Sequence, residues 1–174
     1  MDLHLKGKKV FISGSTKGIG FETARLFLEE GATVIINGRT KKSVESALSS
    51  LNSDNVSGLV ADFLKDSQVE TLIDHIPNDI DILVNNVGIF RGKEFKDETV
   101  DDWNDHFKVN LMSGVQLSKH FLPEMIKRNW GRIIFISSEC ATLVPSDLLS
   151  YSVSKASINV FSSGLAKLTK GTNV

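Results

Sequence analysis

The sequence predicts a doubly wound α/β domain, in which helices cover both faces of a parallel sheet and give three layers, α/β/α. Short, nearly continuous apolar runs alternate with segments of helical apolar spacing along the whole chain. The connections between them are only a few residues long, which is typical of this architecture. The sequence contains no internal repeat, linker or low-complexity segment, so residues 1–174 are expected to form one domain.

The expected strands are the short apolar runs at 10–12, 34–36, 58–61, 80–84 and 133–136. Runs this short, without strict alternation of polar and apolar residues, are typical of strands buried on both faces of a parallel sheet. Right-handed crossovers between them would place their carboxyl ends along one rim of the sheet. Ligands of such sheets bind at that rim.

Amphipathic helices are expected between the strands, where apolar residues recur every three or four positions around 24–28, 44–51 and 69–76. A longer apolar stripe over 103–125 predicts a long helix, and Thr99 and Asp102 have the spacing of a capping box at its start. Pro123 is expected to bend or interrupt this helix near its end.

The composition excludes several classes of function. The chain has 20 basic and 21 acidic residues, so its net charge of −1 offers no field that would collect nucleic acid or an anionic membrane. No apolar run has the length of a membrane span or the form of a secretory signal, which predicts a cytoplasmic protein. The four histidines and Cys140 do not have metal-ligand spacing, so we expect no metal, and the single cysteine excludes an internal disulfide.

A glycine-rich loop follows the first strand and leads directly into a helix. Gly14 permits a tight turn, Gly18 lets the backbone approach a pyrophosphate at the helix N-terminus, and Gly20 lets the helix pack close to the strand. The spacing G-x-x-x-G-x-G departs from the common G-x-G-x-x-G, and a flexible turn is the alternative. The position at the first strand-to-helix junction favours phosphate binding. The expected contacts are Gly14, Ser15, Thr16, Lys17, Gly18, Ile19 and Gly20.

The end of the second strand indicates which dinucleotide is bound. An NAD-preferring site usually has an acidic residue there to bind the ribose hydroxyls, whereas residues 37–40 contain no carboxylate. Arg39, together with Lys17, could instead neutralise a 2′-phosphate, each charge-assisted contact being worth about 1.5 to 3 kcal/mol. We therefore expect NADP, with NAD possible. The alternative is that both residues are solvated surface charges.

A set of polar residues follows the fourth and fifth expected strands. Tyr151 and Lys155 are one helical turn apart and share a face, a pair that by itself is typical of a solvated helix surface. They follow Ser138, which comes after the fifth strand, and Asn110, which lies inside the long helix. Together with the glycine loop and the segment 85–88, these residues occur in the order and spacing of one family. From about residue 8 to its end, the chain resembles the short-chain dehydrogenases/reductases.

The resemblance implies a Rossmann-type fold and NAD(P)-dependent chemistry on a carbonyl or a secondary alcohol. It implies that Tyr151 is the acid/base, Lys155 its electrostatic partner and a ribose ligand, Ser138 the residue that orients the carbonyl, and Asn110 the holder of a relay water. It also implies that Asp62 contacts the adenine and that Asn86 and Gly88 contact the adenosine ribose region, while Tyr151 and Lys155 contact the cofactor as well.

These residue types suit the chemistry. A carbonyl that accepts a hydride becomes an alkoxide, and a positioned acid must supply a proton as that charge appears. A lysine ammonium close to the tyrosine favours the phenolate needed in the reverse direction. A serine hydroxyl can donate to the developing oxyanion, and the nicotinamide supplies the hydride.

Two other functions stay open from the sequence. A sensor or scaffold could bind a dinucleotide without turnover, although such a protein would be expected to lose Tyr151 or Lys155. The chain could also be an inactive fragment, because members of the resembled family continue with two further strands and a loop that covers the substrate. Gly171 is a plausible helix C-cap, and residues 172–174 have the character of the approach to another strand, so we expect a truncated domain. By analogy with the family, a homodimer or homotetramer is expected.

Overall fold

The computed structural model describes residues 3–174, and its five strands form one parallel sheet. The strands are β1 (Lys9–Ile12), β2 (Thr33–Gly38), β3 (Val56–Val60), β4 (Ile82–Asn85) and β5 (Arg132–Phe135). Their order in the sheet is β3-β2-β1-β4-β5, so the direction of winding reverses between β1 and β4. The predicted doubly wound α/β fold is confirmed, and the crevice at this reversal is where such sheets bind ligands.

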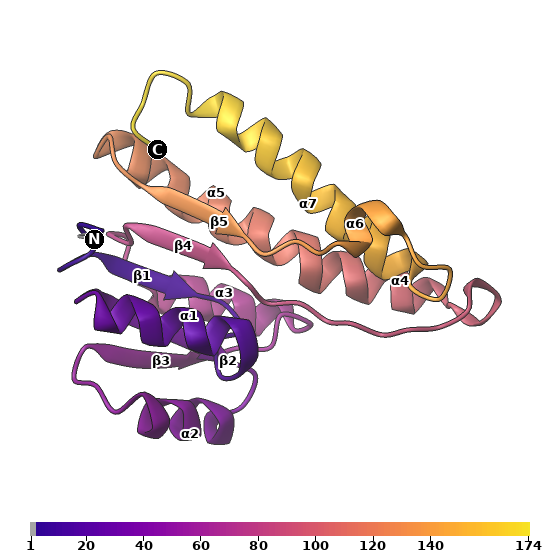
Figure 1. Ribbon diagram of the computed structural model, residues 1–174, viewed down its shortest axis with the longest axis horizontal. Coiled ribbons are helices and arrows are strands. Elements are labelled where there is room, and N and C mark those ends of the chain that lie inside the picture. Colours follow the sequence, from indigo (N-terminus) through magenta and orange to yellow (C-terminus); the bar gives the residue numbers. More distant parts are fainter. Residues whose placement is uncertain (1–2) are drawn as a thin grey trace.

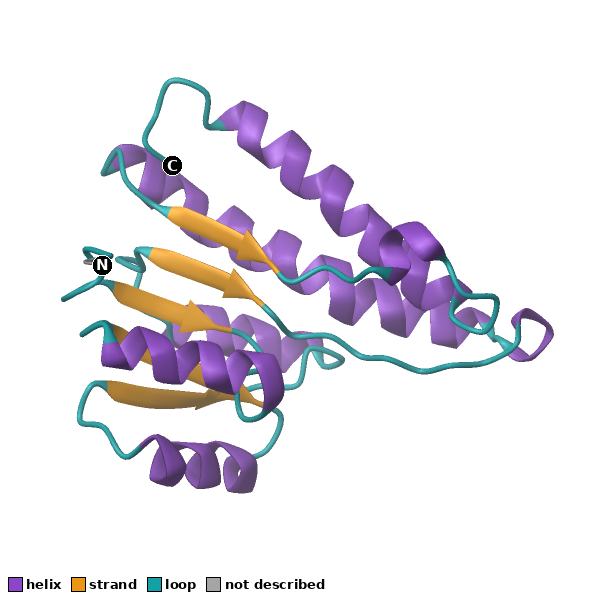
Figure 2. Ribbon diagram, in the orientation of Figure 1, coloured by secondary structure: helices purple, strands orange, loops and turns teal. Residues whose placement is uncertain are grey.

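Helices connect the strands and lie on both faces of the sheet (Figures 1 and 2). They are α1 (Gly18–Glu29), α2 (Lys41–Leu51), α3 (Asp66–His75), α4 (Val100–His106), α5 (Ser113–Lys127), α6 (Cys140–Leu143) and α7 (Leu149–Leu168). A short 3-10 helix, η1 (Phe95–Asp97), and a π-helical segment, η2 (Phe107–Met112), complete the set within residues 3–174. None of these helices is long and apolar enough to cross a membrane.

The core consists of two apolar clusters, one on each face of the sheet, because successive strand residues point to opposite sides. Phe11 of β1 faces the layer of α3 and α5, where Phe121 packs against it with ring centroids 6.5 Å apart. Val10 and Ile12 face the other layer, where Ala24 of α1 is fully buried. The strands are therefore buried on both faces, as their short apolar runs predicted.

The long helix starts as predicted but contains an unpredicted irregularity. Both bonds of the capping box are present: the Asp102 amide donates to Thr99 Oγ1 at 3.2 Å, and the Thr99 amide donates to Asp102 Oδ2 at 2.9 Å. The expected interruption at Pro123 is wrong, because α5 continues past it to Lys127. Buried side chains on both sides of Pro123, including Phe121 and Met125, hold the helix against the sheet. The irregularity is instead the π-helical turn η2, a feature that often marks functional sites.

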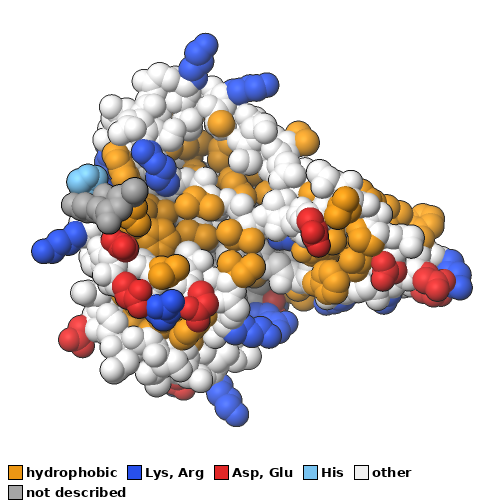
Figure 3. Space-filling model, in the orientation of Figure 1, with side chains coloured by type: hydrophobic (Ala, Val, Ile, Leu, Met, Phe, Trp, Pro, Cys, Tyr) orange, Lys and Arg blue, Asp and Glu red, His pale blue; other side chains and the backbone are white. Residues whose placement is uncertain are grey.

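Strand β5 lies at one edge of the sheet and carries an exposed apolar side. On the face that bears α1, no helix of residues 3–174 covers β4 and β5, and apolar side chains gather there on the surface (Figure 3). Ile134 of β5 is 42% exposed. On the opposite face Phe135 packs edge-on against Phe161 of α7, with ring centroids 5.6 Å apart. An apolar edge of this kind can pair with a further strand.

Candidate active site

The glycine loop packs directly against the segment that follows β4. Gly14 and Gly18 have φ angles of +63° and +60°, in the left-handed region that favours glycine. A Cβ atom on Gly14 would lie 2.8 Å from the Cα atom of Val87, whereas a Cβ on Gly18 would meet nothing within 4 Å. The Asn86 side-chain amide fixes the contact by donating to the Gly14 carbonyl at 2.8 Å. The backbone at Gly18 is thus open to a ligand while the rest of the loop is held.

A cleft of about 740 Å³ crosses the carboxyl ends of β1, β2 and β4. Its lining includes these residues expected to bind the cofactor: Gly14, Thr16, Lys17, Gly18, Arg39, Asp62, Asn86 and Gly88. Five expected contacts do not line it: Ser15, Ile19, Gly20, Tyr151 and Lys155. The Ser15 side chain is fully buried and donates to the Ile12 carbonyl at 2.7 Å. The volume of the cleft and the open backbone at its glycine loop fit a dinucleotide.

Asn37, at the end of β2, supports the glycine loop and was not among the expected contacts. Its Oδ1 accepts a hydrogen bond from the Gly14 amide at 3.0 Å, and its Nδ2 donates to the carbonyls of Leu59 and Ala61. A polar residue that ends an otherwise apolar strand is the signal that could have identified it. The other lining residues that were not predicted are Gly38, Thr40, Ser43, Phe63, Leu64, Val87, Ile89, Phe90, Arg91 and Val109.

Lys155 is buried beside Tyr151 and close to Gly88. Its Nζ lies 6.0 Å from the centroid of the Tyr151 ring and donates to the Ile136 carbonyl at 2.8 Å. The residue is 5% exposed, and burial lowers the pKa of the Lys155 ammonium. Its Nζ would lie 3.4 Å from a Cβ atom on Gly88, a residue that lines the cleft. The fold therefore brings Lys155, from a helix distant in the sequence, close to Gly88 of the cleft and beside Tyr151.

Asn110 joins the segment after β4 to α7. It lies in the π-helical turn η2 and is buried. Its Oδ1 accepts from the Ile89 amide at 2.8 Å, and its Nδ2 donates to the Ile89 carbonyl and to Ser154 Oγ at 3.1 and 2.9 Å. Ser138 lies between β5 and α6, where its Oγ accepts from the Cys140 amide at 3.2 Å. All four predicted catalytic side chains therefore come from elements that follow the carboxyl ends of β4 and β5.

A buried histidine lies next to the expected acid/base. The His106 ring is 1% exposed and stands edge-on to the Tyr151 ring, with centroids 6.1 Å apart. Burial, and then the positive charge of Arg91, lower the pKa of His106. Nearby, a hydrogen bond from Lys93 and others from Thr99 hold the pKa of the Asp102 carboxyl well below its usual range.

The lowered pKa of His106 predicts a pH dependence of stability. The folded chain holds the neutral form of His106 to lower pH than the unfolded chain does, because an unfolded histidine takes up a proton below a pKa of about 6.5. The free energy of unfolding should therefore be greatest above about pH 6.5 and fall as the pH drops toward 5. Thermal unfolding of the wild-type chain and of His106→Asn, measured in steps of pH, checks this. The variant should show a flatter curve in this range, and parallel curves for the two proteins would contradict the prediction.

The Asp102 carboxyl affects the stability of the fold in a different range of pH. Because its pKa is lowered in the folded chain, its contribution to stability is present above the ordinary aspartate pKa of about 3.9 and is lost below it. A loss of stability between pH 7 and 5 therefore cannot come from protonation of Asp102.

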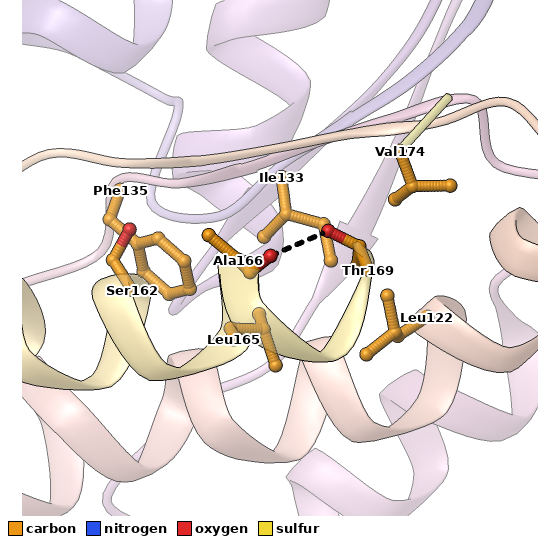
Figure 4. Close-up of a pocket in the computed structure, with 8 residues that line it drawn as sticks. All are labelled: Leu122, Ile133, Phe135, Ser162, Leu165, Ala166, Thr169 and Val174. Atoms are coloured by element: carbon orange, nitrogen blue, oxygen red, sulfur yellow. Dashed lines mark hydrogen bonds between the residues drawn. The ribbon is translucent and has the colours of Figure 1, made fainter. Parts of the chain in front are cut away.

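A second pocket, between α5, β5 and α7, lacks the side chains for acid/base chemistry (Figure 4). Its lining residues are Leu122, Ile133, Phe135, Ser162, Leu165, Ala166, Thr169 and Val174, and none of them has an ionisable side chain. The hydroxyl of Thr169 donates to the Ala166 carbonyl at 3.2 Å. Within residues 3–174, no group of three or more His, Cys, Asp or Glu residues could hold a metal ion.

A comparison with curated proteins identifies relatives that match the whole chain. An uncharacterized oxidoreductase of Bacillus subtilis, YvrD, is 45% identical over 177 residues, which cover 100% of this chain and 67% of the relative. The 3-oxoacyl-[acyl-carrier-protein] reductase FabG of Aquifex aeolicus is 34% identical, with coverage of 100% of this chain and 73% of the relative. The chain thus spans about two thirds to three quarters of the length of these relatives.

A solved structure and a family model agree with these relatives. The crystal structure of a gluconate 5-dehydrogenase from Burkholderia cenocepacia, in complex with NADP and tartrate, superposes with a TM-score of 0.84 at 29% identity. The alignment covers 93% of this chain and 66% of that structure. The model of the short chain dehydrogenase family matches residues 8–174. With its parallel sheet, glycine loop and cleft at the reversal of winding, the chain belongs to the short-chain dehydrogenase family of oxidoreductases.

Proposed function

We propose that this chain transfers a hydride between NADP(H) and a carbonyl or secondary alcohol substrate, with Tyr151 as the acid/base. The observation that carries the proposal is the buried ammonium of Lys155, which lies beside the Tyr151 ring and close to Gly88, a residue that lines the cleft. None of the ion pairs among the described residues includes Lys155. A buried cation without a carboxylate partner stabilises negative charge that arises next to it.

The side chains have complementary roles in this proposal. Tyr151 gives a proton to the substrate oxygen in reduction and accepts it back in oxidation. Ser138 donates a hydrogen bond to the same oxygen, Lys155 stabilises the phenolate and binds the ribose, and Asn110 holds a relay water. The nicotinamide, when bound, supplies or accepts the hydride.

The cofactor proposed is NADP(H), bound along the cleft by the residues that line it. Arg39 and Lys17 are exposed cations at the end of the cleft near β2. Asp62 is the only acidic residue among the described residues that line the cleft, and its Oδ1 accepts from the Leu64 amide at 3.0 Å. The site therefore offers two cations to a 2′-phosphate and places its single carboxylate on the adenine side in this proposal.

The first test compares the two dinucleotides. The chain should prefer NADPH to NADH by a factor on the order of one hundred, from two phosphate contacts discounted for their exposure. Arg39→Ala should reduce this ratio about tenfold, the effect of roughly 1.4 kcal/mol. Lys41→Ala is the matched control, because Lys41 is close by in sequence but does not line the cleft. Equal affinities for NADPH and NADH in the wild-type chain would reject the assignment of NADP.

The proposed substrate has an apolar part next to the carbonyl. Phe90, which is 64% exposed, packs edge-on against the Tyr151 ring with centroids 5.0 Å apart. Leu143 and Val144 are also exposed, at the end of α6, which packs on α7. Oxidation of NADPH, followed by absorbance with a 3-oxoacyl thioester, an apolar ketone and a keto sugar acid, tests this. We expect the first two to be reduced faster, and turnover of the sugar acid alone would contradict the apolar wall.

We also propose that the chain acts on small molecules as a homodimer or homotetramer, by analogy with the family. Sedimentation equilibrium gives the number of copies directly. A strictly monomeric chain that reduces the substrate at full rate would reject the oligomer and leave the chemistry intact.

A further inference from the structure

Three residues from three separate segments meet beside Tyr151, and the family assignment does not account for them. Glu98 follows the 3-10 helix η1, His106 ends α4, and Ser150 lies in the first turn of α7. We propose that Glu98, His106 and Ser150 are positioning residues for Tyr151, which hold the first turn of α7 so that the tyrosine ring keeps one orientation. This inference rests on the proposed function, because it concerns the same acid/base.

The hydrogen bonds of this cluster run in one direction. Ser150 Oγ lies 2.5 Å from Glu98 Oε1 and 2.9 Å from His106 Nδ1. A carboxylate oxygen only accepts, and a serine has a single hydroxyl hydrogen, so Ser150 donates to Glu98. His106 must then donate from Nδ1 to Ser150, which fixes the neutral ring with its proton on Nδ1. The result is a chain of donors from His106 through Ser150 to Glu98.

Glu98 also caps the helix that carries Tyr151. The residue before α7, Leu148, provides no side-chain cap, and the first turn contains no acidic residue. Glu98 Oε1 accepts from the Ser150 backbone amide at 3.1 Å, across 52 residues of sequence. A carboxylate at this position satisfies a free amide of the first turn and interacts favourably with the helix dipole. The α7 terminus is therefore fixed by a side chain from another segment.

The cluster links the helical stretch of α4 and η2 to α7, as the hydrogen bond from Asn110 to Ser154 also does. His106 and Asn110 are four residues apart on one continuous helical stretch, and they bind Ser150 and Ser154, which are four residues apart on α7. Ser150 precedes Tyr151, and Ser154 accepts from Asn110 while donating to the Tyr151 carbonyl at 2.6 Å. Tyr151 is thus held on both sides along its helix.

The tyrosine ring is also held between two other rings. Phe90 contacts it edge-on at 5.0 Å between centroids, and His106 contacts it edge-on at 6.1 Å. The Phe90 side chain is largely exposed, whereas the His106 ring is buried and anchored by Ser150. His106 therefore provides the fixed wall for the ring. A misplacement of about 1 Å at a reacting group can cost on the order of a hundredfold in rate.

The test uses Glu98 and Ser150 variants, because Glu98 is partly exposed and lies outside both apolar core clusters. Glu98→Ala and Ser150→Ala should lower kcat about tenfold or more, with the KM for NADPH unchanged within about twofold. Glu98→Gln keeps an acceptor for Ser150 and should restore most of the lost turnover. Ser163→Ala is the matched control, since Ser163 is an exposed serine of α7 that bonds only to the Asn159 carbonyl in its own helix.

A second readout does not depend on activity. Tyr151 is the only tyrosine of the chain, so a protein labelled with ring-13C tyrosine gives the signals of this residue alone. These signals should shift in Glu98→Ala and in Ser150→Ala and stay in place in Ser163→Ala. Unchanged tyrosine signals and unchanged kcat in both variants would overturn the inference. If the wild-type chain oxidises NADPH with no carbonyl, the proposed function fails, while the tyrosine signals still decide whether the cluster positions the ring.

Discussion

The Tyr151→Phe variant is expected to turn over at least about a hundredfold more slowly than the wild-type chain while binding NADPH with nearly unchanged affinity. The substitution removes the hydroxyl that is proposed to give or take the proton but keeps the ring between Phe90 and His106. The proposed stabilisation of a phenolate by Lys155 is lost as well, so neither direction of the proposed reaction would have its acid/base. Steady-state oxidation of NADPH, together with fluorescence titration of NADPH binding, measures both quantities.

Lys155→Ala tests the two roles proposed for the lysine, stabilisation of the phenolate and binding of the ribose. If the lysine both stabilises the phenolate and binds the ribose, this change lowers turnover and cofactor affinity together. Thermal unfolding of each variant shows whether the fold is kept, and Ser163→Ala again serves as the neutral change on α7. A Tyr151→Phe chain that keeps most of its turnover would reject the acid/base role, and unchanged affinity in Lys155→Ala would reject the ribose contact.

The strands could be predicted from sequence because a doubly buried strand has to be apolar along its whole length. The five expected runs therefore coincide closely with β1 to β5. The start of α4 could be predicted for a similar local reason, since the capping box at Thr99 and Asp102 involves residues only three apart. These features depend on neighbouring residues, and the sequence displays neighbours directly.

The π-helical turn and the continuation of α5 past Pro123 could not be predicted in this way. A proline inside a helix costs about 3 kcal/mol locally, and only the burial of side chains such as Phe121 and Met125 shows that packing outweighs it. The π-helical turn likewise contains Asn110, whose side chain bonds to Ile89 and Ser154, both distant in the sequence. Contacts between residues so far apart leave no local pattern from which they could be predicted.

The cluster of Glu98, His106 and Ser150 was missed for a related reason. Its bonds join residues 52 and 44 positions apart, and none of the three belongs to a short motif. The one local clue was the spacing of four residues that places His106 one helical turn before Asn110. The side chain of Ser15 shows the opposite error, because it lies in the glycine loop yet turns inward and supports β1 instead of lining the cleft.

Gly20→Ala should have a large effect on cofactor binding, although it adds a single methyl group. The new Cβ would overlap the Asn86 side-chain amide and would lie 2.9 Å from both the Gly14 carbonyl oxygen and the Ser15 Cα. Two of these atoms belong to the backbone of the glycine loop, so the loop itself must move. Overpacking of this kind costs about 1 to 3 kcal/mol. Each increment of about 1.4 kcal/mol by which it destabilises the NADPH-bound state lowers the affinity for NADPH tenfold.

Gly164→Ala makes the same chemical change at a site where the structure predicts a gain in stability instead of a loss. Gly164 lies inside α7, and a Cβ there would meet nothing within 4 Å, so alanine should stabilise the helix by about 0.5 to 1 kcal/mol. We therefore expect Gly20→Ala to unfold at a lower temperature and to bind NADPH roughly ten- to a hundredfold more weakly, whereas Gly164→Ala unfolds at a higher temperature with unchanged affinity. Calorimetry of unfolding and of NADPH binding on the two variants measures this contrast. If Gly20→Ala binds NADPH as tightly as Gly164→Ala does, the glycine loop does not form the phosphate site, because a loop displaced by the new methyl group could not keep its backbone contacts with the pyrophosphate.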